Sequence, residues 1–183
     1  MSAALLLMDL QRSIVDRYGE SGEAVARRAG EAAGAARAAG VPVILVRVAF
    51  RPGHPEVSPS NRTFSALRDA GGMLETDELI HPAVGAQPED VIVTKRRVSA
   101  FAGSDLDVVL RAAGVRHLVL GGIATSGVVL STTRAAADLD FDLTILRDAC
   151  ADADEEVHRV LLDKVLARQA EVVDVADWVA TLG

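Results

Sequence analysis

Three stretches of the sequence each place a polar or special residue directly after an apolar run. The run LLLM is followed by Asp9, and the run VIVT is followed by Lys95. A third run leads into the turn GIATSGV at residues 122–128. A carboxylate and an ammonium group can act as an acid–base and electrostatic pair, and a turn that opens a helix offers backbone N–H groups to an anion. The chemistry that these residue types favour is proton transfer next to a stabilised negative charge.

Short apolar runs alternate with longer helical stretches along the whole chain, and these elements must position the three stretches. We expect strands at residues 4–8, 42–48, 91–94, 117–120, 143–146 and 171–175. We expect helices at about residues 23–39, 105–113, 127–137, 155–168 and 175–182. Continuously apolar strands that alternate with helices are typical of a parallel sheet covered on both faces. The sequence therefore predicts an α/β fold.

In an open parallel sheet, ligands bind outside the carboxyl ends of the strands. The predicted strands bring Asp9, Lys95 and the turn to this one edge. Taken singly, an Asp or a Lys at the end of a strand is more often a capping or solvated residue. Together they predict a reactive site at the carboxyl edge of the sheet.

The bulk composition restricts the function classes. With 183 residues the chain fits one domain, residues 1–183, and a net charge of −7 without a basic stripe argues against nucleic-acid binding. No apolar run approaches the roughly 20 residues that a membrane span needs. One cysteine excludes an intramolecular disulfide framework. We expect a cytoplasmic protein that binds a small molecule, with no nucleic-acid or membrane partner.

The region 51–88 is long and irregular, and it holds five of the six prolines. A loop of this length in a compact domain is often a lid or a binding loop. The alternative is a surface excursion with one helix at about residues 63–74. Both interpretations stay open.

Four segments of the sequence resemble those of a known family. The pieces ALLLMDLQ, VIVTKRRVSAFAGSDLDVVLRAAG, LVLGGIATSGVVLSTTRAAADLDF and LRDACADADEEVH resemble the isochorismatase-like (cysteine hydrolase) superfamily, in the family's order. The resemblance implies a three-layer αβα sandwich around a six-stranded parallel sheet. It also implies a homodimer or a homotetramer.

The resemblance further implies roles for individual residues. Asp9 matches the family's catalytic aspartate, a general base towards a thiol, and Lys95 matches the lysine that supports the charged intermediate. The family motif G-[IV]-A-T-x-x-C falls on GIATSGV. Its cis peptide would then join Ile123 to Ala124, and its oxyanion hole would use the N–H groups of Ala124 and Val128.

The sequence departs from the family where the nucleophilic cysteine should stand, because that position holds Val128. A valine cannot form a thioacyl intermediate. Isochorismatases of the superfamily also lack the cysteine, and they hydrolyse a vinyl ether with an aspartate and water. Cys150 lies beyond the following predicted strand, and a free cysteine is commonly a buried small hydrophobe. Ser126 is expected to cap the helix, and neither Ser126 nor Ser131 has a histidine in its motif to activate it.

Substrate contacts are expected from Gln11, Phe50, Arg51 and Ser126. We expect neither a cofactor nor a metal, because a zinc or iron site needs three or four convergent ligands. The stretch after the second predicted strand offers one histidine, His54. Arg51 and His54 could instead meet an anionic substrate.

Three hypotheses about function follow. The leading one is a hydrolase that acts on a small polar or carboxylated metabolite, with Asp9 and Lys95 assisting water and no covalent intermediate. The second is a catalytically silent binding or scaffold protein of the same fold, which Val128 favours. The third is a biosynthetic lyase or isomerase that uses Asp9 as a proton shuttle.

Overall fold

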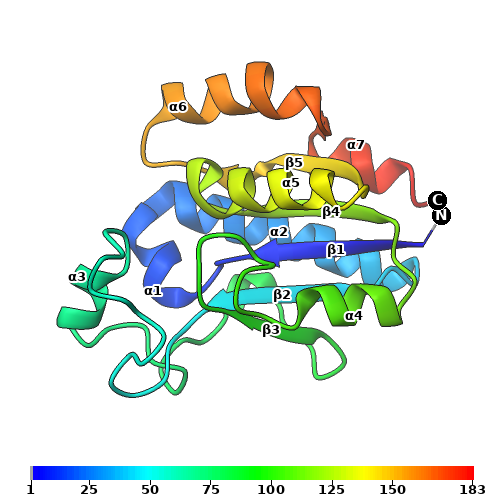
Figure 1. Cartoon of the computed structure of the whole chain (residues 1–183). Coiled ribbons are helices and arrows are strands. Elements are labelled where there is room, and N and C mark those ends of the chain that lie inside the picture. The colour runs from blue at the N-terminus through cyan, green and yellow to red at the C-terminus, as the bar shows by residue number, and fades with distance from the viewer. Residues whose placement is uncertain (1) are drawn as a thin grey trace.

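The computed structural model describes residues 2–183, which form one parallel sheet between two layers of helices (Figure 1). The strands are β1 (Ala3–Met8), β2 (Val43–Val48), β3 (Val91–Lys95), β4 (His117–Ile123), β5 (Asp142–Ala151) and β6 (Glu171–Val173). Their order across the sheet is β3-β2-β1-β4-β5-β6, and every neighbouring pair is parallel. The predicted α/β fold with a six-stranded parallel sheet is confirmed.

The helices divide between the two faces of the sheet. One face is covered by α2 (Gly19–Ala38) and α7 (Val175–Ala180). The other face is covered by α4 (Leu106–Ala112) and α5 (Leu130–Asp138), and by the segment that begins with α6 (Glu155–Val160) and continues through η4 (Leu161–Val165) and η5 (Leu166–Arg168). The remaining short elements are α1 (Arg12–Val15), η1 (Asp16–Tyr18), α3 (Ser65–Asp69), η2 (Pro82–Val84) and η3 (Thr125–Val129). No helix among residues 2–183 is long and apolar enough to cross a bilayer.

The central strand β1 shows why its sequence is apolar without alternation. Leu5 and Leu7 pack with α2 and α7, whereas Leu6 and Met8 pack with α4 and α5. All four side chains are buried, because successive residues of a strand point to opposite faces and both faces are covered. The chain then leaves this core at its carboxyl end with Asp9.

Strand β5 is longer than the sequence analysis predicted, and Cys150 lies inside it. The register between β4 and β5 shifts between Leu120 and Gly122, after which Gly122 pairs with Cys150. The prediction that Cys150 lies beyond the strand is therefore wrong. The polar pair Arg147 and Asp148 interrupts the apolar run in the sequence, while the backbone pairing continues past it.

The region 51–88 contains the expected helix in a shorter form, α3, and its ends are tied to the carboxyl edge of the sheet. Phe50 pairs with Leu74, and Gln11 pairs with Ile80, in isolated β-bridges. Phe50 also packs with Phe64 in a small apolar cluster of its own. The excursion is therefore fixed against the strand ends where the candidate site lies.

Candidate active site

Asp9 and Lys95 form an ion pair across the carboxyl end of β2, the strand that lies between β1 and β3. Asp9 follows β1 with a φ of 56°, and Lys95 is the last residue of β3. The Lys95 Nζ lies 2.9 Å from Asp9 Oδ2. The prediction that these charged groups lie within ion-pair distance at the carboxyl edge is confirmed.

The ammonium group of Lys95 is held in a fixed position. It also donates hydrogen bonds to the carbonyl oxygens of Arg97, at 2.9 Å, and Val98, at 3.0 Å. An ammonium group has three donors, and all three are used here. Lys95 is 1% exposed, so this site contains a buried positive charge that water scarcely screens.

The carboxyl group of Asp9 is unusually basic for an aspartate. Burial raises its pKa from the ordinary value of 3.8 to about 6, although the neighbouring Lys95 lowers it. Oδ2 accepts from Lys95, whereas Oδ1 is buried and has no hydrogen-bond partner among residues 2–183. One oxygen is thus anchored, and the other is an acceptor, unpaired within the described part of the chain, on which the carboxyl can carry a proton. A carboxyl group with a pKa near neutrality can both accept and deliver a proton.

The turn after β4 has the expected backbone. The Ile123–Ala124 peptide bond is cis, as predicted. Gly122 has a φ of 149°, and a Cβ there would lie 2.2 Å from the Met8 carbonyl oxygen, so a glycine is required where this turn passes the end of β1. The N–H groups of Gly127 and Val129 donate to the Ala124 carbonyl oxygen, at 3.0 and 3.2 Å. This closes the turn η3, from which α5 continues.

Two side chains that the sequence analysis did not single out support the same turn. The Ser126 N–H donates to Asp152 Oδ2 at 2.6 Å, and the Thr125 hydroxyl lies 2.7 Å from His158 Nδ1. Burial lowers the pKa of His158, so the neutral form is favoured. Asp152 directly follows β5, but the predicted strand ended at residue 146, so no signal in the sequence pointed to it. His158 lies on α6, also without such a signal.

The prediction that the Ser126 side chain caps the helix after β4 is wrong. Neither η3 nor α5 has a side-chain cap at its start, and the helical segment begins as a π turn. The orphan N–H at this helix start is satisfied by the carboxylate of Asp152 instead, and the Ser126 side chain is exposed.

Val128 fills its position with an apolar side chain. It is 2% exposed and belongs to the same buried cluster as Met8 and Cys150. Cys150 is the one cysteine of the chain, and burial raises the pKa of its thiol to about 12. The thiol is therefore protonated at neutral pH, and a thiol is a much weaker nucleophile than a thiolate.

Gln11 has a clear structural role. Its Nε2 donates to the Val48 carbonyl oxygen at 2.9 Å and to Glu78 Oε2 at 2.6 Å, and its Oε1 accepts from the Val48 N–H at 2.8 Å. Gln11 is 0% exposed, and its amide joins β1, β2 and the long loop. Ser13 also donates to Glu78, whose charge contributes to the raised pKa of Asp9. The expected contact between Gln11 and a substrate stays a prediction.

Phe50 is likewise buried, between Phe64 and His54, with ring centroids 5.4 and 5.5 Å away. His54 Nε2 lies 2.7 Å from the Gly72 carbonyl oxygen. Both side chains thus brace the long loop. Their expected contacts with a substrate also stay predictions.

The arginines near the site are already paired. Arg51 is exposed and bonds to Glu56 at 2.6 Å. Arg96 donates to the Ala49 carbonyl oxygen and pairs with Glu75, which lowers the pKa of that carboxyl. A substrate anion that approached Arg51 or Arg96 would compete with these carboxylates.

A cluster of three possible metal ligands was not foreseen from the sequence. Ligand atoms of Asp16, Glu23 and His81 lie within 4.8 Å of one another. However, His81 Nδ1 accepts from the Ala83 N–H, so in the neutral ring Nε2 carries the proton. That nitrogen lies 3.2 Å from Glu23 and acts as a partner of the carboxylate rather than as a metal ligand.

A comparison with protein families decides where this fold and site belong. The Isochorismatase domain model matches residues 3–177. The chain belongs to the isochorismatase family. An uncharacterized member, YecD of Escherichia coli O157:H7, is 36% identical over 181 residues, which cover 96% of this chain and 94% of YecD.

Two further similarities place this member among its relatives. The ureidoacrylate amidohydrolase RutB of Stutzerimonas stutzeri is 33% identical, over 84% of this chain and 71% of RutB. The solved structure of an isochorismatase family protein from Burkholderia thailandensis has a TM-score of 0.86 and 33% identity, over 99% of this chain and 95% of that chain. The isochorismatase-like fold therefore extends over essentially the whole described chain.

Proposed function

We propose that this isochorismatase-family protein is a hydrolase of a small polar or carboxylated metabolite that activates water directly. The observation that carries the proposal is the pair of Asp9 and Lys95, retained and buried at a site where Val128 leaves no nucleophile. Burying two charges is costly, and a pocket without chemistry gains nothing from it. The relationship to an amidohydrolase supports hydrolysis as the reaction class.

In the proposed reaction, ionised Asp9 accepts a proton from water through Oδ1. The hydroxide so formed attacks the electrophilic carbon of the substrate, and the charge that develops on the substrate oxygen lies near the N–H groups of Ala124 and Val128. Protonated Asp9 then delivers its proton to the leaving group. Lys95 keeps Asp9 positioned and favours its charged form, because the ammonium group lies 2.9 Å from Oδ2.

For an enol ether the order of the proton transfers is reversed. The protonated form of Asp9 delivers its proton to the double bond, and water attacks the resulting oxocarbenium ion. A pKa of about 6 leaves roughly a tenth of Asp9 protonated at pH 7, so both routes are accessible to one carboxyl group. Neither route needs a thiol.

The proposal is tested by screening small amides, ureido acids, esters and enol ethers for turnover, with Asp9→Asn as the matched variant. We expect at least one compound to be hydrolysed and the isosteric Asn to reduce kcat by about 100-fold or more, since it can neither accept nor deliver the proton. An Asp9→Asn protein that keeps full activity would refute the assignment.

A catalytically silent binding protein is the second candidate, and Val128 is the observation that favours it. Such a protein would bind ligands from the same screen and turn over none of them. A thermal shift identifies the compounds that bind in either case, because a ligand that binds only the folded state raises Tm. Turnover of a compound that binds then separates the two candidates.

A further inference from the structure

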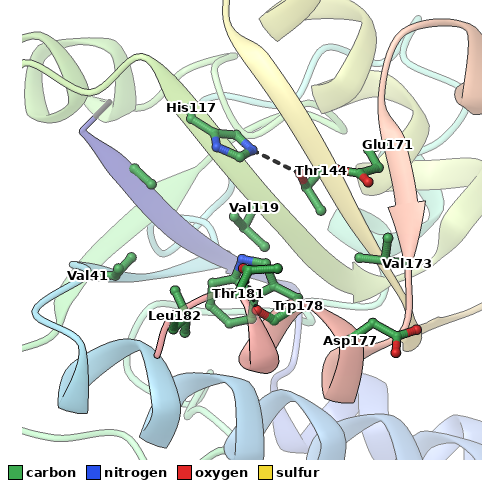
Figure 2. Close-up of a pocket in the computed structure, with 11 residues that line it drawn as sticks. Val41, His117, Val119, Thr144, Glu171, Val173, Asp177, Trp178, Thr181 and Leu182 are labelled. Atoms are coloured by element: carbon green, nitrogen blue, oxygen red, sulfur yellow. Dashed lines mark hydrogen bonds between the residues drawn. The ribbon is translucent and has the colours of Figure 1, made fainter.

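A hollow lies at the end of the sheet opposite to Asp9 and Lys95, under the carboxyl end of α7 (Figure 2). Its volume is about 310 Å³, at the lower end of the range of roughly 300–1,000 Å³ typical of small-molecule sites. Ala3, the first residue of β1, lines this hollow, whereas Asp9 directly follows the last residue of β1. At about 3.3 Å per residue, the six residues of β1 place the two sites roughly 20 Å apart.

The sheet supplies the floor of this hollow. His117 and Val119 are two residues apart on β4, so their side chains point to the same face. Thr144 pairs with Val119 across the strands, and Glu171 pairs with Thr144. The row formed by Val119, Thr144 and Glu171 thus ends in a carboxylate. The Thr144 hydroxyl also lies 2.9 Å from His117 Nε2 (Figure 2).

The walls are mainly apolar. Val41, Val173 and Leu182 line the sides, and Trp178 extends from α7 towards the sheet (Figure 2). Trp178 is 6% exposed, so only a small part of its ring reaches the hollow. Together with Val41, Val173 and Leu182, it offers an apolar surface to the body of a ligand.

The charge of the hollow has one sign. Glu171 and Asp177 lie on the same side of the hollow as Val173 in Figure 2, and both are exposed. Within residues 2–183 neither carboxylate forms an ion pair or a side-chain hydrogen bond, and no Lys or Arg lines the hollow. The electrostatic complement of these walls is a cation that carries an apolar group.

We propose that the hollow beneath α7 is a binding site for a small organic cation, an amine with an aromatic or branched aliphatic body. The body lies against the partly exposed Val41, Val173 and Leu182, and the ammonium group lies on the side of the hollow that carries Glu171 and Asp177. The site is separate from the Asp9–Lys95 pair, so binding there does not depend on hydrolysis.

The single tryptophan of the chain lies in this wall, so its fluorescence reports on the site alone. The probe is 2-phenylethylammonium, titrated to roughly 10 mM, which detects a dissociation constant in the millimolar range or tighter. Uncharged 2-phenylethanol and anionic 3-phenylpropionate have nearly the same body. We expect saturable binding of the amine, weaker binding of the alcohol and the weakest binding of the acid.

The double variant Glu171→Gln/Asp177→Asn removes the charge preference. Each exposed ion pair contributes little, so we expect binding of the amine to weaken roughly five- to tenfold in total and binding of the alcohol to stay unchanged. The matched control is Glu20→Gln/Glu89→Gln, which removes two exposed carboxylates elsewhere. Glu20 lies in the first turn of α2 as Asp177 lies in the first turn of α7, so the two double variants perturb their helices alike.

Val173→Phe fills the hollow and should abolish binding of all three probes, measured by isothermal titration on protein whose circular dichroism is unchanged. The proposal is overturned if no probe saturates, if the alcohol binds as tightly as the amine, or if the two double variants behave alike. It is also overturned if the fluorescence changes with protein concentration and not with the probe, because a second copy of the chain would then cover the hollow.

Discussion

The buried carboxyl of Asp9 should make the stability of the protein depend on pH in an unusual direction. Its pKa is about 6 in the folded protein and near the ordinary 3.8 in the unfolded chain. Between these values the folded state binds more protons than the unfolded state, so this group's contribution to stability is fully present below about pH 4 and is lost as the pH rises through 6. Most aspartates in ion pairs behave in the opposite way, because their folded pKa is lowered.

The size of the effect follows from the two pKa values. Raising a carboxyl pKa from 3.8 to about 6 corresponds to a loss of about 3 kcal/mol of unfolding free energy across this pH range. Burial opposes the charge, and the ammonium of Lys95 offsets part of that cost, since its effect on the pKa has the opposite sign. The pH dependence of stability therefore measures the net free-energy cost of ionising Asp9 in the folded protein.

Urea unfolding of the wild type and of Asp9→Asn, from about pH 4 to about pH 8, isolates this group from the other carboxyls. Asn tolerates the positive φ of Asp9 and cannot ionise. We expect the stability of the wild type, relative to the variant, to fall by 2–3 kcal/mol (an order-of-magnitude estimate) as the pH rises. Asp140→Asn is the control, because Asp140 also has a positive φ, of 62°, and is exposed. A difference that is flat or that rises with pH would refute the reasoning about Asp9.

Further predictions concern the turn, the thiol and the assembly. Val128→Cys should add no more than slight amide hydrolysis if water is the nucleophile; a large gain, with a trapped acyl-enzyme, would indicate a degenerate cysteine amidase instead. Cys150→Ser should stay active, and thiol alkylation should leave the folded wild type untouched, because the thiol is 4% exposed and its pKa is raised to about 12; a folded but inactive Cys150→Ser contradicts this. Asp152→Ala should lower the unfolding free energy by about 1 kcal/mol and reduce turnover, and Asp152→Asn should restore most of both, because it keeps an acceptor for the turn N–H. Light scattering at micromolar concentration should show a homodimer or a homotetramer, and a monomer would contradict that prediction.

The fold was predictable because β1 and its neighbours are short apolar runs separated by helical stretches. Leu5 to Met8 must be covered on both faces, and a parallel sheet between helices achieves this. The extension of β5 to Ala151 was not predictable, because backbone pairing is indifferent to the polar side chains of Arg147 and Asp148 that interrupt the pattern. Strand ends depend on such pairing, which leaves little trace in side-chain chemistry.

The geometry of the candidate site was predictable where the residues end strands. Asp9 and Lys95 meet because the carboxyl ends of parallel strands share one edge. The supporting contacts were harder to foresee, because they join segments far apart in the chain. Gln11 reaches Glu78 across 67 positions and Thr125 reaches His158 across 33, and no local pattern encodes such pairs.

We propose above that Asp9 and Lys95 hydrolyse a substrate with water and without an enzyme-bound intermediate. The most direct test of this proposal is a turnover experiment in ¹⁸O-labelled water, with the intact mass of the protein measured while substrate is still being consumed. We expect one ¹⁸O atom in the hydrolysed product, an unmodified protein mass throughout, and loss of labelling with Asp9→Asn. A protein mass raised by a substrate fragment, or labelled product formed at the wild-type rate by Asp9→Asn, would contradict it.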